Sequence, residues 1–372
     1  MLLASANYLA LENYKVISLS QRVSQAWTDS ALTSLLMLAG GAVAIMGFMS
    51  VTAMVLVYAE RKIAAHFQCR LGPMRVGWHG TLQSIADALK LFFKEDIVPT
   101  NTDKMLHALG PAICVMATLL ALIALPLSPT FNIADMNIGV LYLSAVSGLG
   151  VLGILLGGWS SNNKWSLLGA MRAGAQIISY EISMTISILV VVLFAGSMKF
   201  STIVQSQVDG WWIWRVPVVG FVAFFIFLIS STAENNRTPF DMAEAESELT
   251  AGFHTEYSGL RFAMFFLAEY INLFIVSAVG ATLFLGGWMP FHIGNFTTFN
   301  AVMDLIPAGV WFALKVAALV FLSMWFRWTF PRLRVDQLMK LEWKVLLPIG
   351  LVNLTVGAIL VLSELYFFVW NP

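Results

Sequence analysis

Long apolar segments recur along the whole of this chain, and they constrain its fold more than any other feature. A helix that crosses a hydrocarbon core of about 30 Å needs about 20 mostly apolar residues. The apolar runs here are continuous instead of alternating, which predicts helices and not barrel strands. We therefore predict an all-α polytopic membrane protein with eight transmembrane helices. The predicted spans are residues 31–58, 108–128, 138–159, 174–197, 216–233, 262–287, 305–326 and 346–368.

Positive charge gathers on one side of this topology. If the spans alternate, segments 60–107, 160–173, 234–261 and 327–344 face the same side, and they hold sixteen of the 21 Lys and Arg residues. Because Lys and Arg accumulate in cytoplasmic loops, we expect these four segments in the cytoplasm and both termini outside it. Residues 1–30 are expected to form an N-terminal extracytoplasmic segment, and 31–372 a single eight-helix membrane domain.

The segment AENNRTPFDMAEAESELTAGFHTEY, residues 233–257, concentrates six of the 21 acidic residues between two predicted spans. A run of this kind usually forms a solvated face. Here it is interleaved with apolar residues, and crowded carboxylates in a partly dry site titrate as a coupled unit, which suits proton handling. A divalent cation site is the alternative, although EF-hand spacing is lacking. Thr238 followed by Pro239 predicts that a helix starts there.

A second informative segment is TLQSIADALKLFFK, residues 81–94, which predicts an amphipathic helix on the cytoplasmic side. Its apolar face is formed by Leu82, Ile85, Ala86, Leu89 and Phe93. Gln83, Asp87, Lys90 and Lys94 lie on the other face. Such a helix either lies flat at the membrane interface or roofs a lateral opening to the lipid.

Three ionisable residues, Glu181, Glu269 and Lys315, fall inside predicted spans. Each costs about 2.5–3.5 kcal/mol at a helix centre on insertion scales. Structural pairing of a carboxylate with the lysine is one interpretation, and a proton relay is the other. The segment GILLG, residues 153–157, predicts close packing of helices. The two cysteines, Cys69 and Cys114, are far apart, so we expect neither a disulfide framework nor an iron–sulfur cluster or metal held by this chain.

Several segments together resemble one known family. They are ERKIAAHFQCRLGP, ADALKLFFKED, ISYEIS, AENNRTPFDMAEAESELTAGFHTEYSGLRFAMFFLAEY and RWTFPRLRVDQLMKLEWKVLLP. They resemble the quinone-chamber membrane subunit of respiratory complex I, the proton-pumping NADH:quinone oxidoreductase of bacteria and mitochondria. The resemblance runs from about residue 58 to the C-terminus. It implies a subunit without a redox centre that forms a quinone-access tunnel and couples quinone reduction to proton translocation.

The resemblance also implies roles for individual residues. Those that would line the tunnel are Arg61, Gln68, Arg70, Arg237, Phe262 and Phe266. The coupling cluster would be formed by Asp87, Asp241, Glu244, Glu246 and Glu248. The residues that would extend it are Glu60, Glu181, Glu234, Glu256, Glu269 and Lys315. The quinone would be a substrate, because no cofactor is expected to bind to this chain alone.

The implied partners are peripheral-arm subunits that carry NADH, FMN and the iron–sulfur clusters, the terminal one beside the quinone head group. Small membrane subunits and antiporter-like subunits would complete the complex in the bacterial inner membrane, and no nucleic acid is expected. Two other classes stay open from the residues alone. One is an ion-coupled secondary transporter, and the other is a scaffold that docks a peripheral arm. The related subunit of membrane-bound hydrogenases or ferredoxin-linked complexes is a closer alternative.

Overall fold

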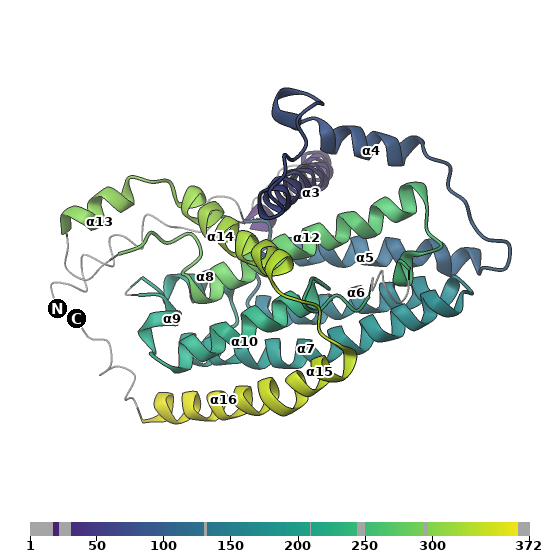
Figure 1. Ribbon diagram of the computed structural model, residues 1–372. Coiled ribbons are helices and arrows are strands. Elements are labelled where there is room, and N and C mark those ends of the chain that lie inside the picture. The colour runs from purple at the N-terminus through teal and green to yellow at the C-terminus, as the bar shows by residue number, and fades with distance from the viewer. Residues whose placement is uncertain are drawn as a thin grey trace.

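The computed structural model describes residues 18–21, 31–129, 132–208, 210–243, 250–292 and 297–363. Helices α5, α6, α7, α10 and α12 run side by side through the centre, and α16 borders them (Figure 1). The longer helices are α3 (Ala31–Phe67), α5 (Lys104–Ala124), α6 (Gly139–Ser160), α7 (Lys164–Ala195), α10 (Val219–Glu234), α12 (Gly259–Phe284), α14 (Ala308–Thr329) and α16 (Leu347–Leu362).

Shorter helical elements connect the long ones. At the left-hand end of the bundle in Figure 1 lie α8 (Phe200–Gln205), α9 (Trp212–Arg215) and α13 (Thr297–Asp304). The other short elements are η1 (Trp78–Gly80), α4 (Gln83–Phe93), η2 (Gly252–His254), α15 (Val335–Leu341) and the π-helix η3 (Glu342–Leu346). Residues 335–362 form one continuous helical segment through α15, η3 and α16.

The prediction of an all-α polytopic membrane protein is confirmed. Within the described ranges, seven helical segments are long and apolar enough to cross a membrane, namely α3, α5, α6, α7, α12, α14 and Val335–Leu362. The remaining predicted span, 216–233, corresponds to α10, an apolar helix of only 16 residues. At 1.5 Å per residue α10 is roughly 24 Å long, which is short of a full hydrocarbon core.

Two predicted loops are shorter in the structure than the sequence suggested. Helix α3 continues through Glu60 and Arg61 to Phe67, and α7 already starts at Lys164. Charged residues near the end of an apolar run suggested a loop, but a helix can keep them when other helices supply their partners. The segment predicted as 60–107 therefore begins with two further turns of helix.

The amphipathic helix is confirmed as α4, which lies outside the main bundle at the upper right of Figure 1. Its side chains Leu82, Leu89 and Phe93 are exposed, so within the described residues its apolar face stays uncovered. An ion pair between Asp87 of α4 and Arg61 of α3 holds it against the bundle. An exposed apolar face next to membrane-crossing helices fits either an interfacial helix or a roof.

Close packing at GILLG is also confirmed, where α6 crosses α5. A methyl group added at Gly153 would lie 2.5 Å from Sγ of Cys114 and 2.9 Å from the backbone oxygen of Gly110. Contacts that short do not occur, so only the missing side chain at Gly153 lets the two backbones approach so closely.

The predicted helix start at Thr238 is wrong. Residues 237–243 form turns, bends and irregular backbone, and the Thr238–Pro239 peptide bond is cis. Some of their backbone groups bond within the segment, and others bond outside it, as where the amide of Leu333 donates to the carbonyl of Pro239 at 3.0 Å. Side chains of Phe240 and Met242 are buried between α7 and α15. Tertiary packing has overridden the local capping signal.

Candidate functional site

A cluster of four charged side chains, of which Arg237 and Glu60 are buried, joins elements that are far apart in the sequence. The guanidinium of Arg237 lies 2.7 Å from Glu60 and 3.5 Å from Glu269, and Arg327 forms a second ion pair with Glu60. We call these four residues the Arg237 cluster. They come from α3, the turn after α10, α12 and α14, so this site exists only when the bundle is assembled.

The centre of the cluster is almost dry. The side chain of Arg237 is 1% exposed and that of Glu60 is 6% exposed. Burial by itself lowers the pKa of Arg237, but the carboxylates of Glu60 and Glu269 outweigh it and raise that pKa above its ordinary value. The guanidinium also lies 5.0 Å from the ring centre of Tyr270, a cation–π contact. Arg237 is therefore a fixed positive charge between two carboxylates.

A glutamine on α7 fixes the turn that carries Arg237. Nε2 of Gln176 donates to the backbone oxygens of Ala233 and Phe240, both at 2.7 Å. Asn236 adopts a positive φ of 49°, which asparagine tolerates better than most residues. Together these contacts close residues 233–240 into a compact turn and aim Arg237 at α3 and α12.

The main cavity, of about 400 Å³, lies between α5, α6, α7, α10 and α12. Its wall is mostly apolar, with Phe262 and Phe266 of α12 among the lining residues. One part is polar and is lined by Ser147, Glu234, Asn235, Asn236, Glu269 and Asn272. An apolar cavity with a few convergent polar groups is the usual form of a small-molecule site.

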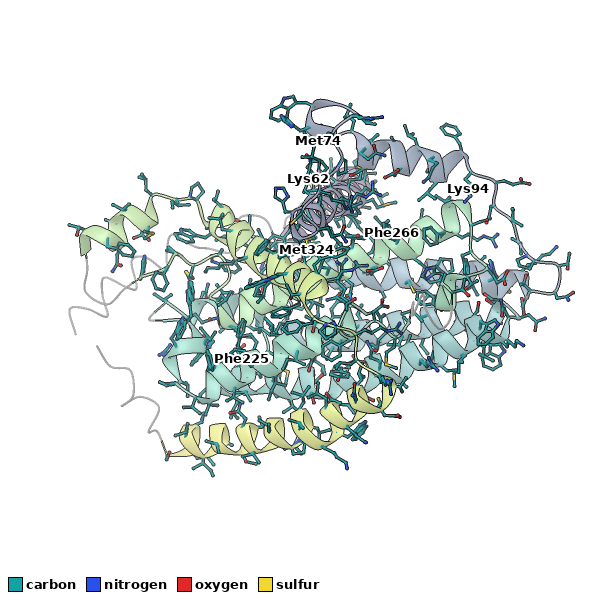
Figure 2. The ribbon with its side chains drawn as sticks, viewed as in Figure 1. Lys62, Met74, Lys94, Phe225, Phe266 and Met324 are labelled. Atoms are coloured by element: carbon teal, nitrogen blue, oxygen red, sulfur yellow. The ribbon has the colours of Figure 1, made fainter. Side chains whose placement is uncertain are left out.

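A second cavity of about 220 Å³ lies on the other side of the cluster, among α3, α12 and α14. It is lined by Glu60, Arg61, Arg70 and Tyr270, among others. Phe266, Glu269 and Arg327 line both cavities. The two cavities therefore adjoin at the Arg237 cluster. Phe266 on α12 lies near α3 in Figure 2, at this shared wall.

Further carboxylates lie near this wall. Glu234, at the end of α10, is buried and lines the main cavity. Glu181 of α7 accepts a hydrogen bond of 2.6 Å from Ser147, which lines the same cavity. Asp87 is linked to the second cavity through its ion pair with Arg61. Asp241 is half-buried, four residues beyond Arg237. Acids on α3, α7, α10 and α12 thus meet around one polar region.

Three residues predicted for the site lie elsewhere. Glu256 accepts a hydrogen bond of 2.6 Å from Asn163, beside a polar surface hollow. Gln68 is exposed and accepts a bond from Arg70. Nζ of Lys315 donates to the backbone oxygens of Gly287 and Met289, at 2.9 and 2.6 Å, beyond the far end of α12 from Glu269. In the part of the chain that the structure describes, Lys315 has no carboxylate partner, so the predicted pairing does not occur there.

Other predictions fall on residues outside the described ranges, namely Glu244, Glu246 and Glu248. Sequence reasoning also missed three residues of the site: Gln176, Tyr270 and Arg327. Arg327 looks like an interfacial cation that ends an apolar run. Only the crossing of α14 over α3 reveals its partner, Glu60.

In the described ranges, no group of three or more His, Cys, Asp or Glu side chains could hold a metal ion.

Comparison with known proteins identifies close relatives. A family model described as NADH dehydrogenase matches residues 40–358. The H subunit of NADH-quinone oxidoreductase from Bacteroides fragilis is 53% identical over 325 residues, which is 87% of this chain and 91% of that protein. Proteins of the same name from Phocaeicola vulgatus and Geobacillus kaustophilus are both 52% identical, covering 87% and 82% of this chain and 91% and 87% of their own lengths. The resemblance indicated by the sequence motifs is confirmed.

Removing Arg237 should strongly destabilise the fold, because the cluster would be left with one positive and two negative charges. We expect Arg237→Met to cost about 3–5 kcal/mol of unfolding free energy, since it breaks the buried ion pair with Glu60 and also removes the guanidinium that faces Glu269. Adding Glu60→Gln restores charge balance and should recover part of that loss. Thermal unfolding of the two variants in detergent measures the difference. Equal loss in the single and double variants would contradict the charge-balance account.

His254 makes stability depend on pH. It lines the main cavity, and burial lowers its pKa from 6.5 to about 4. Between pH 6.5 and pH 4, His254 is therefore protonated in the unfolded chain and neutral in the folded chain. Because the unfolded state binds more protons in this range, the free energy of unfolding falls as pH drops from 6.5 to 4. Between pH 7 and pH 5 we expect a loss of about 2 kcal/mol from this residue. Unfolding midpoints of His254→Gln should show less pH dependence than wild type, whereas the exposed His66→Gln serves as control.

Proposed function

This chain belongs to the NADH dehydrogenase family, as a multi-pass membrane component of the H type in NADH-quinone oxidoreductase, and from that premise we propose that its two adjoining cavities form the quinone-access route. The observation that carries the proposal is their shared wall of Phe266, Glu269 and Arg327. A hydrophobic quinone on this route would lie against the Arg237 cluster. Phe262 and Phe266 would contact the quinone, and Arg61 and Arg70 would line the second cavity.

Proton coupling is the second part of the proposal. Reduction of a quinone to a quinol takes up two protons for two electrons, so the reaction creates a local demand for protons. The pKa values of carboxylates that lie within a few ångströms of fixed guanidinium groups depend on the charges around them, so a change of charge during quinone reduction would alter their protonation. Glu60 and Glu269 are paired directly with Arg237. Glu181, Glu234, Asp241 and the acids at 244, 246 and 248 would continue the relay away from the quinone.

Some predicted relay members make no direct contact with the Arg237 cluster. Asp87 is tied to the site only through Arg61, and Glu256 and Lys315 lie apart from both cavities. Their place in the relay rests on the family resemblance. Lys315, bound to two backbone oxygens and 4.6 Å from the ring centre of Trp211, has the contacts of an anchor for the loop after α12.

Other subunits would complete the proposed complex. Peripheral-arm subunits would carry NADH, FMN and the iron–sulfur clusters, and would contribute the quinone head-group site. Small membrane subunits and antiporter-like subunits would receive the coupling signal. We propose a bacterial cytoplasmic membrane, with both termini on its extracytoplasmic side, because the Lys- and Arg-rich segments belong in the cytoplasm. A transporter would function alone in vesicles, whereas this subunit should be active only within its complex.

Phe266 should contribute to quinone binding. We expect Phe266→Ala to raise the KM for a membrane quinone about tenfold with normal assembly, since an apolar contact worth roughly 1.5 kcal/mol is lost. The matched control is Phe225→Ala, because Phe225 on α10 is exposed and lines neither cavity (Figure 2). Quinone-reductase rates at equal content of assembled complex give both values. If the two variants had the same KM, the quinone would not bind against this wall.

The acid segment should be needed for coupling. We expect Glu246→Gln to impair both quinone reductase activity and proton pumping while assembly stays normal, because it removes one charge from the relay. Activity with inhibitor titration, at equal complex content, is the measurement. Normal turnover would instead favour a docking surface for a basic partner. This outcome is independent of the Phe266 experiment, so quinone access and proton coupling are tested separately.

A further inference from the structure

A carboxyl group outside the Arg237 cluster is completely buried. Glu342 begins the π-helix η3, between α15 and α16, and it is 0% exposed. One of its oxygens accepts a hydrogen bond from Oγ of Ser183 on α7, and Ser183 is also 0% exposed. The other oxygen is buried and has no hydrogen-bond partner among the described residues. Short π-helical turns inside α-helices are frequent at functional sites.

No positive charge in the described ranges compensates Glu342 by an ion pair. The titratable groups of the adjoining elements are few. Tyr180 of α7 donates its hydroxyl hydrogen to the backbone oxygen of Leu338 instead. Asp336 and Lys340 of α15 and Lys344 of η3 are exposed to the surroundings. Between residues 347 and 362, α16 has no titratable side chain. Among the described residues, Leu338 and Leu346 are buried in the same apolar cluster as Tyr180.

An ionised carboxylate in this pocket would be very costly. A carboxylate presents about four acceptor positions, and among the described residues one hydroxyl, that of Ser183, donates to it. Burial of an unpaired charge is so unfavourable that such groups take up a proton instead. We propose that Glu342 and Ser183 form a proton-binding site, in which the carboxyl group is held as a neutral acid between α7 and the C-terminal helix. The ligand of this site is a single proton.

The site is separate from the main cavity because it lies on another face of α7, and α7 contributes no residue to the Arg237 cluster. Glu181 points to Ser147 of α6 and the main cavity, whereas Ser183, two residues further along, points to η3. Two residues turn an α-helix by about 200°, so the two carboxyl groups lie on roughly opposite sides of α7. Neither Ser183 nor Glu342 lines either cavity of the proposed quinone route.

The position of Glu342 allows protons to reach it. It is seven residues beyond Val335, the start of the continuous helical segment, which is roughly 10 Å along the helix axis. Its sequence neighbour Trp343 is 49% exposed, so the π-turn itself forms part of the surface. A brief opening of this turn would connect the carboxyl group to the end of the bundle that carries the basic segment 327–344.

Infrared spectroscopy of the assembled complex tests the site directly, because a neutral carboxylic acid has a carbonyl stretch that a carboxylate lacks. At neutral pH, the wild type minus Glu342→Gln difference spectrum should contain this band, shifted by exchange into heavy water. Asp336→Asn, which removes an exposed acid six residues earlier, is the matched control and should leave the band unchanged. Both variants should assemble normally, since the amide at position 342 replaces a neutral group of the same shape and the amide at position 336 replaces an exposed side chain.

Ser183→Ala provides a second readout that does not depend on losing Glu342. Removal of the hydroxyl should shift the same band to higher frequency, because the carbonyl loses its hydrogen bond. The band and its Ser183-dependent shift together would establish the site, even if Glu342→Gln failed to accumulate. A wild-type spectrum without a Glu342-dependent carboxylic acid band, or one in which Ser183→Ala shifts nothing, would overturn the proposal.

Discussion

The guanidinium of Arg237 is the charge around which the described part of the molecule is organised. It is almost fully buried, so the fold must supply opposite charges, and Glu60 and Glu269 do so from two different helices. Glu60 in turn binds Arg327 of α14. A buried ion pair is weak support for stability by itself, but breaking one is costly. The cluster therefore fixes how α3, α12 and α14 meet, and the proposed quinone route passes where these helices adjoin.

Satisfying backbone polar groups away from water is the second constraint on this bundle. The non-helical turn after α10 would be unfavourable inside a membrane protein without partners for its carbonyls. Gln176 provides two of them, and Leu333 provides another. At the opposite end Lys315 serves the loop after α12 in the same way. In both of these places one buried side chain bonds the irregular backbone, and one of the two carries Arg237.

Helix α7 contributes side chains to the turn of Arg237, to the surroundings of the main cavity and to the Glu342 site. It carries Gln176, which holds the turn of Arg237, then Tyr180 and Glu181, and then Ser183 beside Glu342. One face therefore serves the main cavity and another serves the C-terminal helix. If the Glu342 site holds a proton as proposed, its neutral state keeps these helices packed together without burying a charge. The same helix would then stabilise two regions that respond to protons in different ways.

The all-α membrane fold, the amphipathic helix and the family could be predicted from the sequence, because apolar length, helical periodicity and contiguous motifs are local properties. It also identified Glu60, Arg237, Glu269 and Phe266 as site residues through the resemblance. Contacts between distant segments were needed to show that Arg327 pairs with Glu60, that Lys315 lies apart from the acids, and that no helix starts at Thr238. Those outcomes depend on which helices cross and where. A buried charge finds its partner through contacts between segments as much as 267 residues apart, which no local pattern encodes.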